Sequence, residues 1–303
     1  MKRNIIFIIL TIAVVFPFRL SAQRELPLPA IPDSLETRQQ KMTYLMTHFW
    51  DAMDWNDPAL ERDSLFLEQN LSNFFSVMAV ADSISSSEGV RLLLKHSHKR
   101  PGCAEQIAEL AETYLYNPAS PYLNAESYLA FADCLRNDSL VDESVRSRAD
   151  FSYGQIMKNR KGHTATDFRF VDRNGNERLL SDIRETGTRC VLFFYDTDCR
   201  DCHETAKRMA MDGTITRLVA TGELQIIAID AYGADPIHWQ SDADTWPREW
   251  IIGRSPEGEI DADEIYVLRI SPTIYLLSPD NRVIAKELTF DRLLETVKSD
   301  AER

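Results

Sequence analysis

A run of hydrophobic residues from Cys190 to Tyr195 ends four residues before the first of two closely spaced cysteines, Cys199 and Cys202. Such an uninterrupted run is typical of a strand that is buried on both faces of a sheet. The residues from about Arg200 to Val219 have a helical pattern. The sequence therefore predicts that Cys199 lies where a buried strand leads into a helix, with Cys202 about one helical turn further on.

Three kinds of chemistry use a Cys-x-x-Cys pair. A structural zinc site needs four ligands, and the only nearby histidine, His203, is poorly placed to share a metal with the adjacent Cys202. Cys-x-x-Cys-His is also the attachment signature of c-type haem. However, Met209 and Met211 are too close on the same helix to reach the opposite face of a haem. We favour the third possibility, a redox dithiol, and expect neither a metal nor a cofactor.

The position of the pair suits thiol chemistry. The start of a helix offers unpaired backbone N–H groups and the positive end of the helix dipole. Both favour the thiolate, which is the reactive form of cysteine. Cys202, one turn along, is within reach of a mixed disulfide formed by Cys199. The motif is weak by itself, and its place after a strand in an α/β pattern strengthens it.

The first half of the chain has a helical pattern from about Asp33 to Arg160. One buried helix face is marked by Met42, Leu45, Met46, Phe49, Trp50 and Met53, which follow the i, i+3, i+4, i+7 spacing. Further helices are predicted near Ser64–Asp82, Ser86–His96, Pro101–Tyr116, Asn124–Arg136 and Ser139–Lys158. We expect an all-α domain over residues 23–160.

The second half changes character at about Thr164. "DFRFVDRNGNERLL" predicts a hairpin around an Asn-Gly turn. "LQIIAID" predicts a second buried strand, "DADEIYVLRI" a short helix, and "TIYLLS" with "VIAKEL" an antiparallel hairpin before a closing helix. Strands that alternate with helices favour a layered α/β domain. The basic stretch Lys158–His163 marks the boundary, so this domain spans residues 161–303.

Pro272 begins the strand that would lie beside the cysteine pair. With this proline, the opening "HTATDFRFVDRNGNERLLSD" and the strand "VLFFYDTDC", the sequence from about Gly162 onward resembles the thioredoxin superfamily, in particular exported TlpA-like (redoxin-type) thiol–disulfide proteins. The resemblance implies a central mixed sheet flanked by helices. It also implies that Cys199 attacks, Cys202 resolves, Pro272 is a cis-proline, and the backbone of Ser271 pairs with the substrate strand.

The helical half also resembles a domain of unknown function found in exported bacterial proteins, on the stretch "YLYNPASPYLNAESYLAF". The resemblance to thioredoxins is incomplete at the site. Thr197 and Asp198 stand where a tryptophan commonly precedes the first cysteine, and Phe193 stands where many thioredoxins keep a buried acid. No Pro-x-x-x-Thr-x-x-Cys arrangement is present, which disfavours a peroxidase. The segment from Ala231 to Gly253 is interpreted as an insertion between strands, with three tryptophans.

The first residues predict export. Lys2 and Arg3 precede a hydrophobic run from Ile5 to Phe16, and Ala22 offers a small residue for cleavage, so residues 1–22 are interpreted as a signal peptide. The run is shorter than the roughly 20 residues that span a bilayer. We therefore expect a soluble protein, without a membrane span after cleavage, in a bacterial periplasm.

Partners follow from the dithiol and the charge. The expected partners are proteins with disulfides or thiols and a membrane or periplasmic electron donor. The formal net charge of −13 argues against nucleic acid as a partner. The leading function is an exported thiol–disulfide oxidoreductase that reduces or exchanges disulfides in envelope proteins. The alternative is a binding scaffold that uses the thioredoxin-like domain as a passive platform.

The charges around the dithiol indicate a direction for the reaction. Asp196, Asp198, Asp201 and Glu204 outnumber Arg200 and His203 in this stretch. Negative neighbours disfavour a thiolate and so raise the pKa of the attacking cysteine. Since strong oxidants are those whose reduced form is stabilised, the acidic surroundings predict a reductant or an exchanger.

Three cysteines lie outside the pair. Cys190, in the buried strand, is expected to be a free thiol that behaves as a small apolar residue. Cys103 and Cys134 lie on consecutive predicted helices, on either side of the connection between them. An exported protein can keep disulfides, and these two residues would face each other if the helices were antiparallel. We therefore interpret them as a possible structural disulfide.

Overall fold

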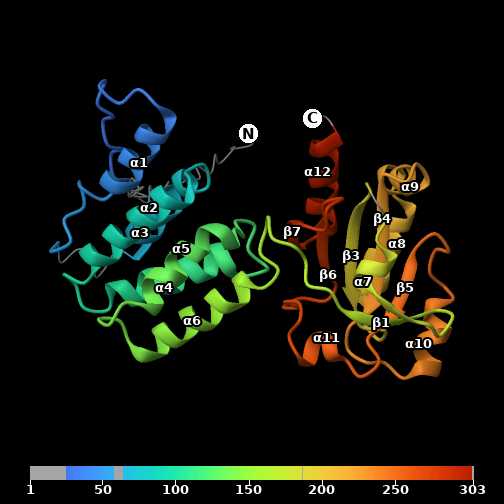
Figure 1. The fold of residues 1–303 in the computed structure, drawn as a ribbon. Coiled ribbons are helices and arrows are strands. Elements are labelled where there is room, and N and C mark those ends of the chain that lie inside the picture. The colour runs from blue at the N-terminus through green and yellow to red at the C-terminus, as the bar shows by residue number, and fades with distance from the viewer. Residues whose placement is uncertain (1–24, 58–63, 186, 302–303) are drawn as a thin grey trace, which may run out of the picture.

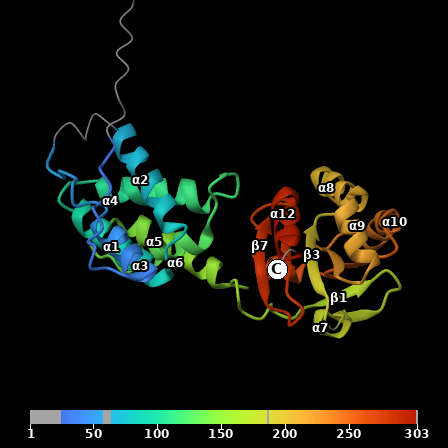
Figure 2. The same ribbon diagram turned by 90° about the horizontal axis from the view of Figure 1, so that it is seen from above.

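The computed structural model describes residues 25–57, 64–185 and 187–301, so the predicted signal peptide lies outside the described residues. The chain forms a helical lobe and a sheet-containing lobe, which lie side by side (Figure 1). The view from above shows the same separation, with β7 (Val283–Leu288) and α12 (Phe290–Ala301) nearest the helices (Figure 2). No helix in the described ranges is long and apolar enough to cross a membrane.

The helical lobe is built around one hydrophobic core. Its elements are α1 (Arg38–His48), α2 (Ser64–Met78), α3 (Ser83–Ser97), α4 (Cys103–Ala111), the π-helix η2 (Glu112–Tyr116), α5 (Ala125–Arg136) and α6 (Glu143–Met157). The first helix is shorter than predicted and ends at His48, but Met46 within it and Phe49 and Trp50 in the turn after it are all buried in this core. Aromatic contacts tie the later helices together, such as Tyr116 stacked on Tyr128 with ring centroids 4.8 Å apart.

The second lobe is a seven-stranded mixed sheet with helices on both faces, which confirms the predicted layered α/β domain. The strand order is β2-β1-β5-β4-β3-β6-β7. The strands are β1 (Arg169–Asp172), β2 (Glu177–Leu179), β3 (Arg189–Tyr195), β4 (Leu224–Asp230), β5 (Ile251–Arg254), β6 (Thr273–Leu277) and β7. The central strands β3, β4 and β5 are parallel, and β6 is antiparallel to β3.

The central strand β3 separates two hydrophobic cores because successive side chains point to opposite faces. Val191, Phe193 and Tyr195 enter one core, with α8 (Arg200–Met211), α9 (Gly213–Ala220), α10 (Pro236–Ala243) and α12. Cys190, Leu192 and Phe194 enter the other, with α7 (Leu180–Ile183) and α11 (Glu259–Ala262). Cys190 is fully buried and free, which confirms its predicted role as a small apolar residue.

Two local predictions in this lobe are corrected. The helix predicted over "DADEIYVLRI" is only α11, which ends at Ala262. The residues after it leave the helix because Tyr266 and Val267 are buried and bonded to other segments, for example the Tyr266 hydroxyl to the Thr166 carbonyl at 2.7 Å. The predicted insertion contains β5, which pairs with both β4 and β1 and is therefore part of the sheet.

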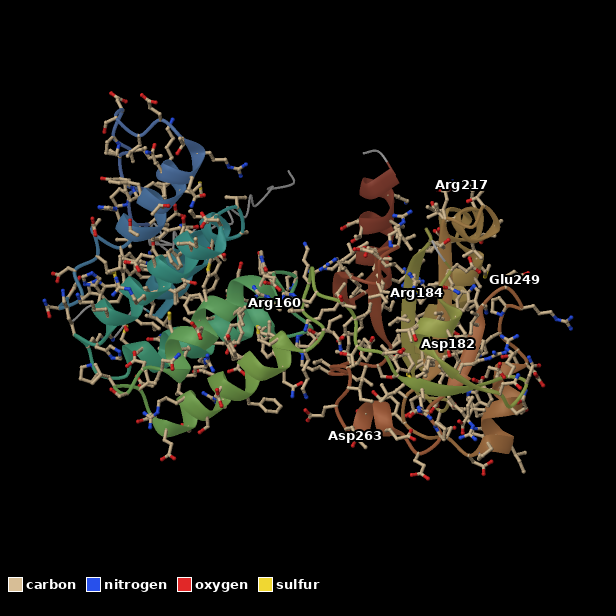
Figure 3. All side chains as sticks on the ribbon, viewed as in Figure 1. Arg160, Asp182, Arg184, Arg217, Glu249 and Asp263 are labelled. Atoms are coloured by element: carbon tan, nitrogen blue, oxygen red, sulfur yellow. A yellow bond between two sulfur atoms is a disulfide. The ribbon has the colours of Figure 1, made fainter. Side chains whose placement is uncertain are left out.

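Basic side chains of the second lobe bond to backbone carbonyls of the helical lobe. Arg269 donates to the Tyr116 carbonyl at 2.6 Å, and its guanidinium lies 3.8 Å above the Tyr116 ring. Lys286 donates to the carbonyls of Ile156 and Lys158 at 2.9 and 2.8 Å. Near the junction of the lobes, Arg160 (Figure 3) pairs with Glu126 of α5 at 2.7 Å. The bonds of Arg269 and Lys286 join the two lobes through backbone groups that every residue type provides.

Candidate functional site

The dithiol lies where the sequence predicts it, between β3 and α8. Cys199 is the N-cap of α8, and its sulfur accepts a hydrogen bond from the Cys202 backbone N–H at 3.1 Å. An N-cap sulfur takes the place of the side-chain oxygen that usually satisfies the free N–H groups of a helix start. The two cysteines form a disulfide with a Cα–Cα distance of 5.3 Å.

The two sulfurs have different access to solvent. Cys199 is only partly buried, whereas Cys202 is 0% exposed. A disulfide of another protein can therefore reach Cys199 but not Cys202. This difference suits the roles that the resemblance implies, in which Cys199 attacks and Cys202 resolves.

The loop before β6 lies against both sulfurs. The Ser271–Pro272 peptide bond is cis, which confirms the conformation implied for Pro272. The Ser271 carbonyl oxygen lies 4.0 Å from the Cys199 sulfur, and the Ser271 hydroxyl lies 3.2 Å from the Cys202 sulfur. The fold thus brings all four predicted site residues together, and it adds a side-chain contact where only a backbone role was predicted for Ser271.

A buried carboxylate at the end of β4 organises the loop that precedes Cys199. Asp230 is fully buried, and one of its oxygens accepts hydrogen bonds from the backbone N–H and hydroxyl of Thr197 at 2.9 and 2.6 Å. The other oxygen accepts from the backbone N–H groups of Tyr232, Gly233 and Ala234. These five donors satisfy the buried charge and join the ends of two neighbouring strands.

The segment interpreted as an insertion packs against the dithiol helix through α10. His203 donates from Nε2 to the Thr197 carbonyl at 2.9 Å, and its Nδ1 lies 3.5 Å from an oxygen of Asp242. Burial raises the pKa of Asp242. Both ring nitrogens therefore face oxygen atoms, which fixes the orientation of the imidazole between the Thr197 carbonyl and Asp242.

A second histidine, which belongs to α10, lies at the rim of the site. His238 Nε2 lies 2.9 Å from an oxygen of Asp198, and the hydrogen bond to this carboxylate raises the pKa of His238. Deeper in the fold, Trp239 donates to the Tyr195 hydroxyl at 3.0 Å, and Trp246 lies with its ring centroid 4.6 Å from that of Tyr195. The two tryptophans therefore pack against Tyr195, the last residue of β3.

The possible disulfide between Cys103 and Cys134 is wrong for this structure, in which both thiols are free. Cys103 begins α4 and points into the helical core, where it is 3% exposed. Cys134, near the end of α5, faces α3 instead, with its sulfur 3.9 Å from the Ser87 carbonyl. The two cysteines do lie on consecutive helices, but on faces that pack against different neighbours.

The site itself offers thiols and hydroxyls rather than a ligand set for an ion. Among residues 25–57, 64–185 and 187–301, no group of three or more His, Cys, Asp or Glu side chains could hold a metal. His203, which could have belonged to a haem attachment motif, is bonded to Thr197 and Asp242 as described above.

The arrangement of both lobes is similar to that of a known structure. A crystal structure of a thioredoxin-like protein from Bacteroides caccae has 24% identity and a TM-score of 0.77, with 90% of this chain and 97% of that chain covered. The C-terminal half of this chain has a thioredoxin-like fold. Residues 11–159 match a domain of unknown function, DUF5106, which confirms the resemblance of the helical half.

Two shorter structures are similar to 46% of the chain each. One is a conserved protein of unknown function from Bacteroides fragilis, with 31% identity, 98% of that chain covered and a TM-score of 0.43. The other is the thioredoxin domain of a thiol-disulfide oxidoreductase from Bacteroides vulgatus, with 22% identity, 96% of that chain covered and a TM-score of 0.40. No curated protein matches the chain.

Several residues around the dithiol of the thioredoxin-like domain were missed from the sequence. Asp230 ends a predicted buried strand, and the carboxyl ends of parallel strands meet at one edge of a sheet. That rule could have placed Asp230 near Cys199. His238, Asp242 and Tyr232 had no such signal, because their positions depend on how the segment after β4 folds back over the site.

Proposed function

We propose that this protein is an exported thiol–disulfide oxidoreductase that reduces or exchanges disulfides in proteins of the cell envelope, here called clients. The observation that supports this most is the position of the dithiol against the Ser271–Pro272 loop. Cys199 is accessible at a helix start, Cys202 is in bonding distance behind it, and the loop lies beside both sulfurs.

The proposed reaction has two exchange steps. The Cys199 thiolate attacks a client disulfide, so that one client sulfur leaves as a thiolate and the other stays bonded to Cys199. Cys202 then attacks the Cys199 sulfur, which forms the Cys199–Cys202 disulfide and releases the second client sulfur. Two electrons pass from the dithiol to the client, and the leaving thiolates take up protons from water. A periplasmic or membrane dithiol would then reduce the protein again.

The charges at the rim support a reducing or exchanging direction. Asp198 pairs with His238, so this carboxylate is partly neutralised. Asp196, Asp201 and Glu204 remain against Arg200, and negative neighbours disfavour the thiolate form of the reduced pair. We expect an equilibrium with glutathione to give a potential well below that of a strong oxidant. A value near about −120 mV would contradict this direction.

Trapping of clients tests the proposed activity. Cys202→Ser removes the resolving thiol, so mixed disulfides through Cys199 should accumulate when the reduced variant meets an envelope extract. Reduction should release the captured proteins, and the Cys199→Ser/Cys202→Ser double variant should capture none. If the single variant also captures none, the scaffold function is favoured, in which the helical domain recruits a partner and the dithiol is passive.

A further inference from the structure

The resolving cysteine is in an unfavourable place for losing its proton. Cys202 is 0% exposed, and its surroundings in the core include Phe193, Ala206 and Met209. Burial in apolar surroundings disfavours a thiolate. The same effect of burial raises the pKa of Cys190, in the same sheet, to about 12. Cys202 nevertheless has to act as a nucleophile when a mixed disulfide is resolved.

The buried carboxylate under the loop before Cys199 already has its hydrogen-bond partners. Both oxygens of Asp230 accept hydrogen bonds, from Thr197 on one side and from the N–H groups of Tyr232, Gly233 and Ala234 on the other. All five donors lie on the loops that follow β3 and β4, so Asp230 has a structural role there.

One hydroxyl group connects Cys202 with solvent. The Ser271 hydroxyl lies 3.2 Å from the Cys202 sulfur, while Ser271 itself is exposed. Tyr232, which is 37% exposed, lies on the loop after β4, near the side chain of Ser271. The Ser271 hydroxyl can therefore accept a proton on one side and release one on the other.

We propose that the Ser271 hydroxyl is a catalytic group, which carries the proton of Cys202 to solvent during resolution. The inference rests on the proposed function. In this step the Cys202 thiol gives its proton to the Ser271 oxygen as the Ser271 proton passes to water. The Cys202 sulfur bonds to the Cys199 sulfur, the bond from Cys199 to the client breaks, and the client thiolate takes up one proton from water.

Other titratable groups surround this path and stay in place in the variants below. Asp196 and Asp261 act on Tyr232 electrostatically, together with the buried Asp230. The next residue after Cys202 is His203, whose ring lies between Thr197 and Asp242 of α10. The hydroxyl is thus tested by removing it alone, with these charges unchanged.

The test uses the two successive thiol-exchange steps with the aromatic disulfide 5,5′-dithiobis(2-nitrobenzoate) as the probe. The reduced full-length protein should release one coloured thiolate when Cys199 attacks and a second when Cys202 resolves the adduct. Ser271→Ala should slow the second release about tenfold at neutral pH and leave the first unchanged. This is less than acid–base catalysis usually contributes, because water can enter in place of the hydroxyl.

Matched variants separate a catalytic hydroxyl from a structural one. Ser271→Thr keeps a hydroxyl and should restore the second release. The defect of Ser271→Ala should shrink as pH rises, since Cys202 then loses its proton without help.

The possible failures are distinguishable. If Cys199 releases no first thiolate in the wild-type protein, the proposed function fails and this inference fails with it. If the first release is normal and Ser271→Ala resolves at the wild-type rate at every pH, only the inference is overturned. An equal slowing of both releases, without recovery in Ser271→Thr, would also overturn it, because the effect would then be structural.

Discussion

A cysteine stands at the start of a helix in each lobe, and only one of these positions has the features of a redox site. Cys103 begins α4 in the helical lobe, where it is 3% exposed and burial raises the pKa of its thiol. Cys199 caps α8 in the thioredoxin-like lobe, where it is partly exposed and bonded to Cys202. A helix start is therefore not sufficient for thiol chemistry, which also requires access to solvent and a second sulfur within reach.

The surroundings of the two cysteines differ in the same way. Gly102, which precedes α4, provides no side-chain cap, and Ala104 and Ile107 beside Cys103 are buried in the helical core. Polar groups of β4, α10 and the loop before β6 lie around Cys199. The first arrangement stabilises a fold, whereas the second exposes a reactive group and holds it in place.

Removal of the sulfurs should give the largest difference between the lobes. Cys202→Ser should abolish catalytic turnover, because mixed disulfides through Cys199 would then no longer be resolved. Cys103→Ala and Cys134→Ala should keep the wild-type turnover. The measurement is the rate of insulin disulfide reduction with dithiothreitol as the electron source. Loss of turnover in a folded Cys103→Ala protein would show that the helical lobe takes part in the chemistry.

The buried ion pair beside the contact between the lobes should have the next largest effect. Arg269→Ala would leave Glu287, whose side chain is 4% exposed, without its bonds to Arg269 at 2.6 and 3.0 Å. Removal of one partner of a buried ion pair leaves the other charge uncompensated. The free energy of unfolding then falls by about 3–5 kcal/mol, which is more than a hundredfold in the unfolding equilibrium. The free energy of unfolding is measured by urea unfolding, followed by circular dichroism.

The matched control for this change is an arginine on the surface. Arg217 of α9 (Figure 3) pairs with Glu223 at 3.4 Å, and the two side chains are 56% and 48% exposed. Arg217→Ala should change the free energy of unfolding by less than about 1 kcal/mol. Similar losses for both variants would mean that the buried ion pair contributes no more than an exposed one.

Thiol modification should separate the free cysteines from the dithiol. Burial raises the pKa of Cys134 to about 11 from an ordinary value of 9.0. The thiolate fraction of Cys134 at neutral pH should therefore be about a hundredfold lower than in the unfolded chain. Alkylation with iodoacetamide, read by mass spectrometry after mild reduction, should modify Cys199 first. If Cys134 reacts as fast in the folded as in the unfolded protein, the contrast between the lobes is lost.

The smallest effect should come from a helix cap of the helical lobe. Asp82 caps α3, and the hydrogen bond from the Ser85 side chain is the main cause that lowers its pKa to about 2 from 3.8. Because the folded state has the lower pKa, this stabilisation is complete above about pH 4 and is lost as the pH falls through 2. At neutral pH Asp82→Ala should cost about 1 kcal/mol, about fivefold in the equilibrium.

Asp142 is the matched control for Asp82. It precedes α6 in the same lobe but makes no side-chain cap hydrogen bond. Asp142→Ala should therefore leave the free energy of unfolding almost unchanged, in acid as at neutral pH. Equal effects of the two substitutions would assign the loss to the removed charge near a helix start rather than to the cap.

Much of the fold was predictable because its signals are local. The uninterrupted apolar run of β3 and the 3.6-residue period of the first helix both come from neighbouring side chains that share one face. The prediction was wrong for β5, where a long segment with three tryptophans was interpreted as an insertion between strands. It was also wrong for the end of α11, since contacts with distant segments replaced the helix there.

By itself, the sequence determined the junction of strand and helix that places Cys199 and Cys202, and the order of a helical half and an α/β half. Only the tertiary structure decided which distant groups meet there: Ser271 at the buried sulfur, Asp230 under the preceding loop, and α10 beside His203. It also kept Cys103 and Cys134 apart on consecutive helices. The reason is that a periodic pattern shows which face of an element is buried, whereas the partner of that face depends on how the whole chain packs.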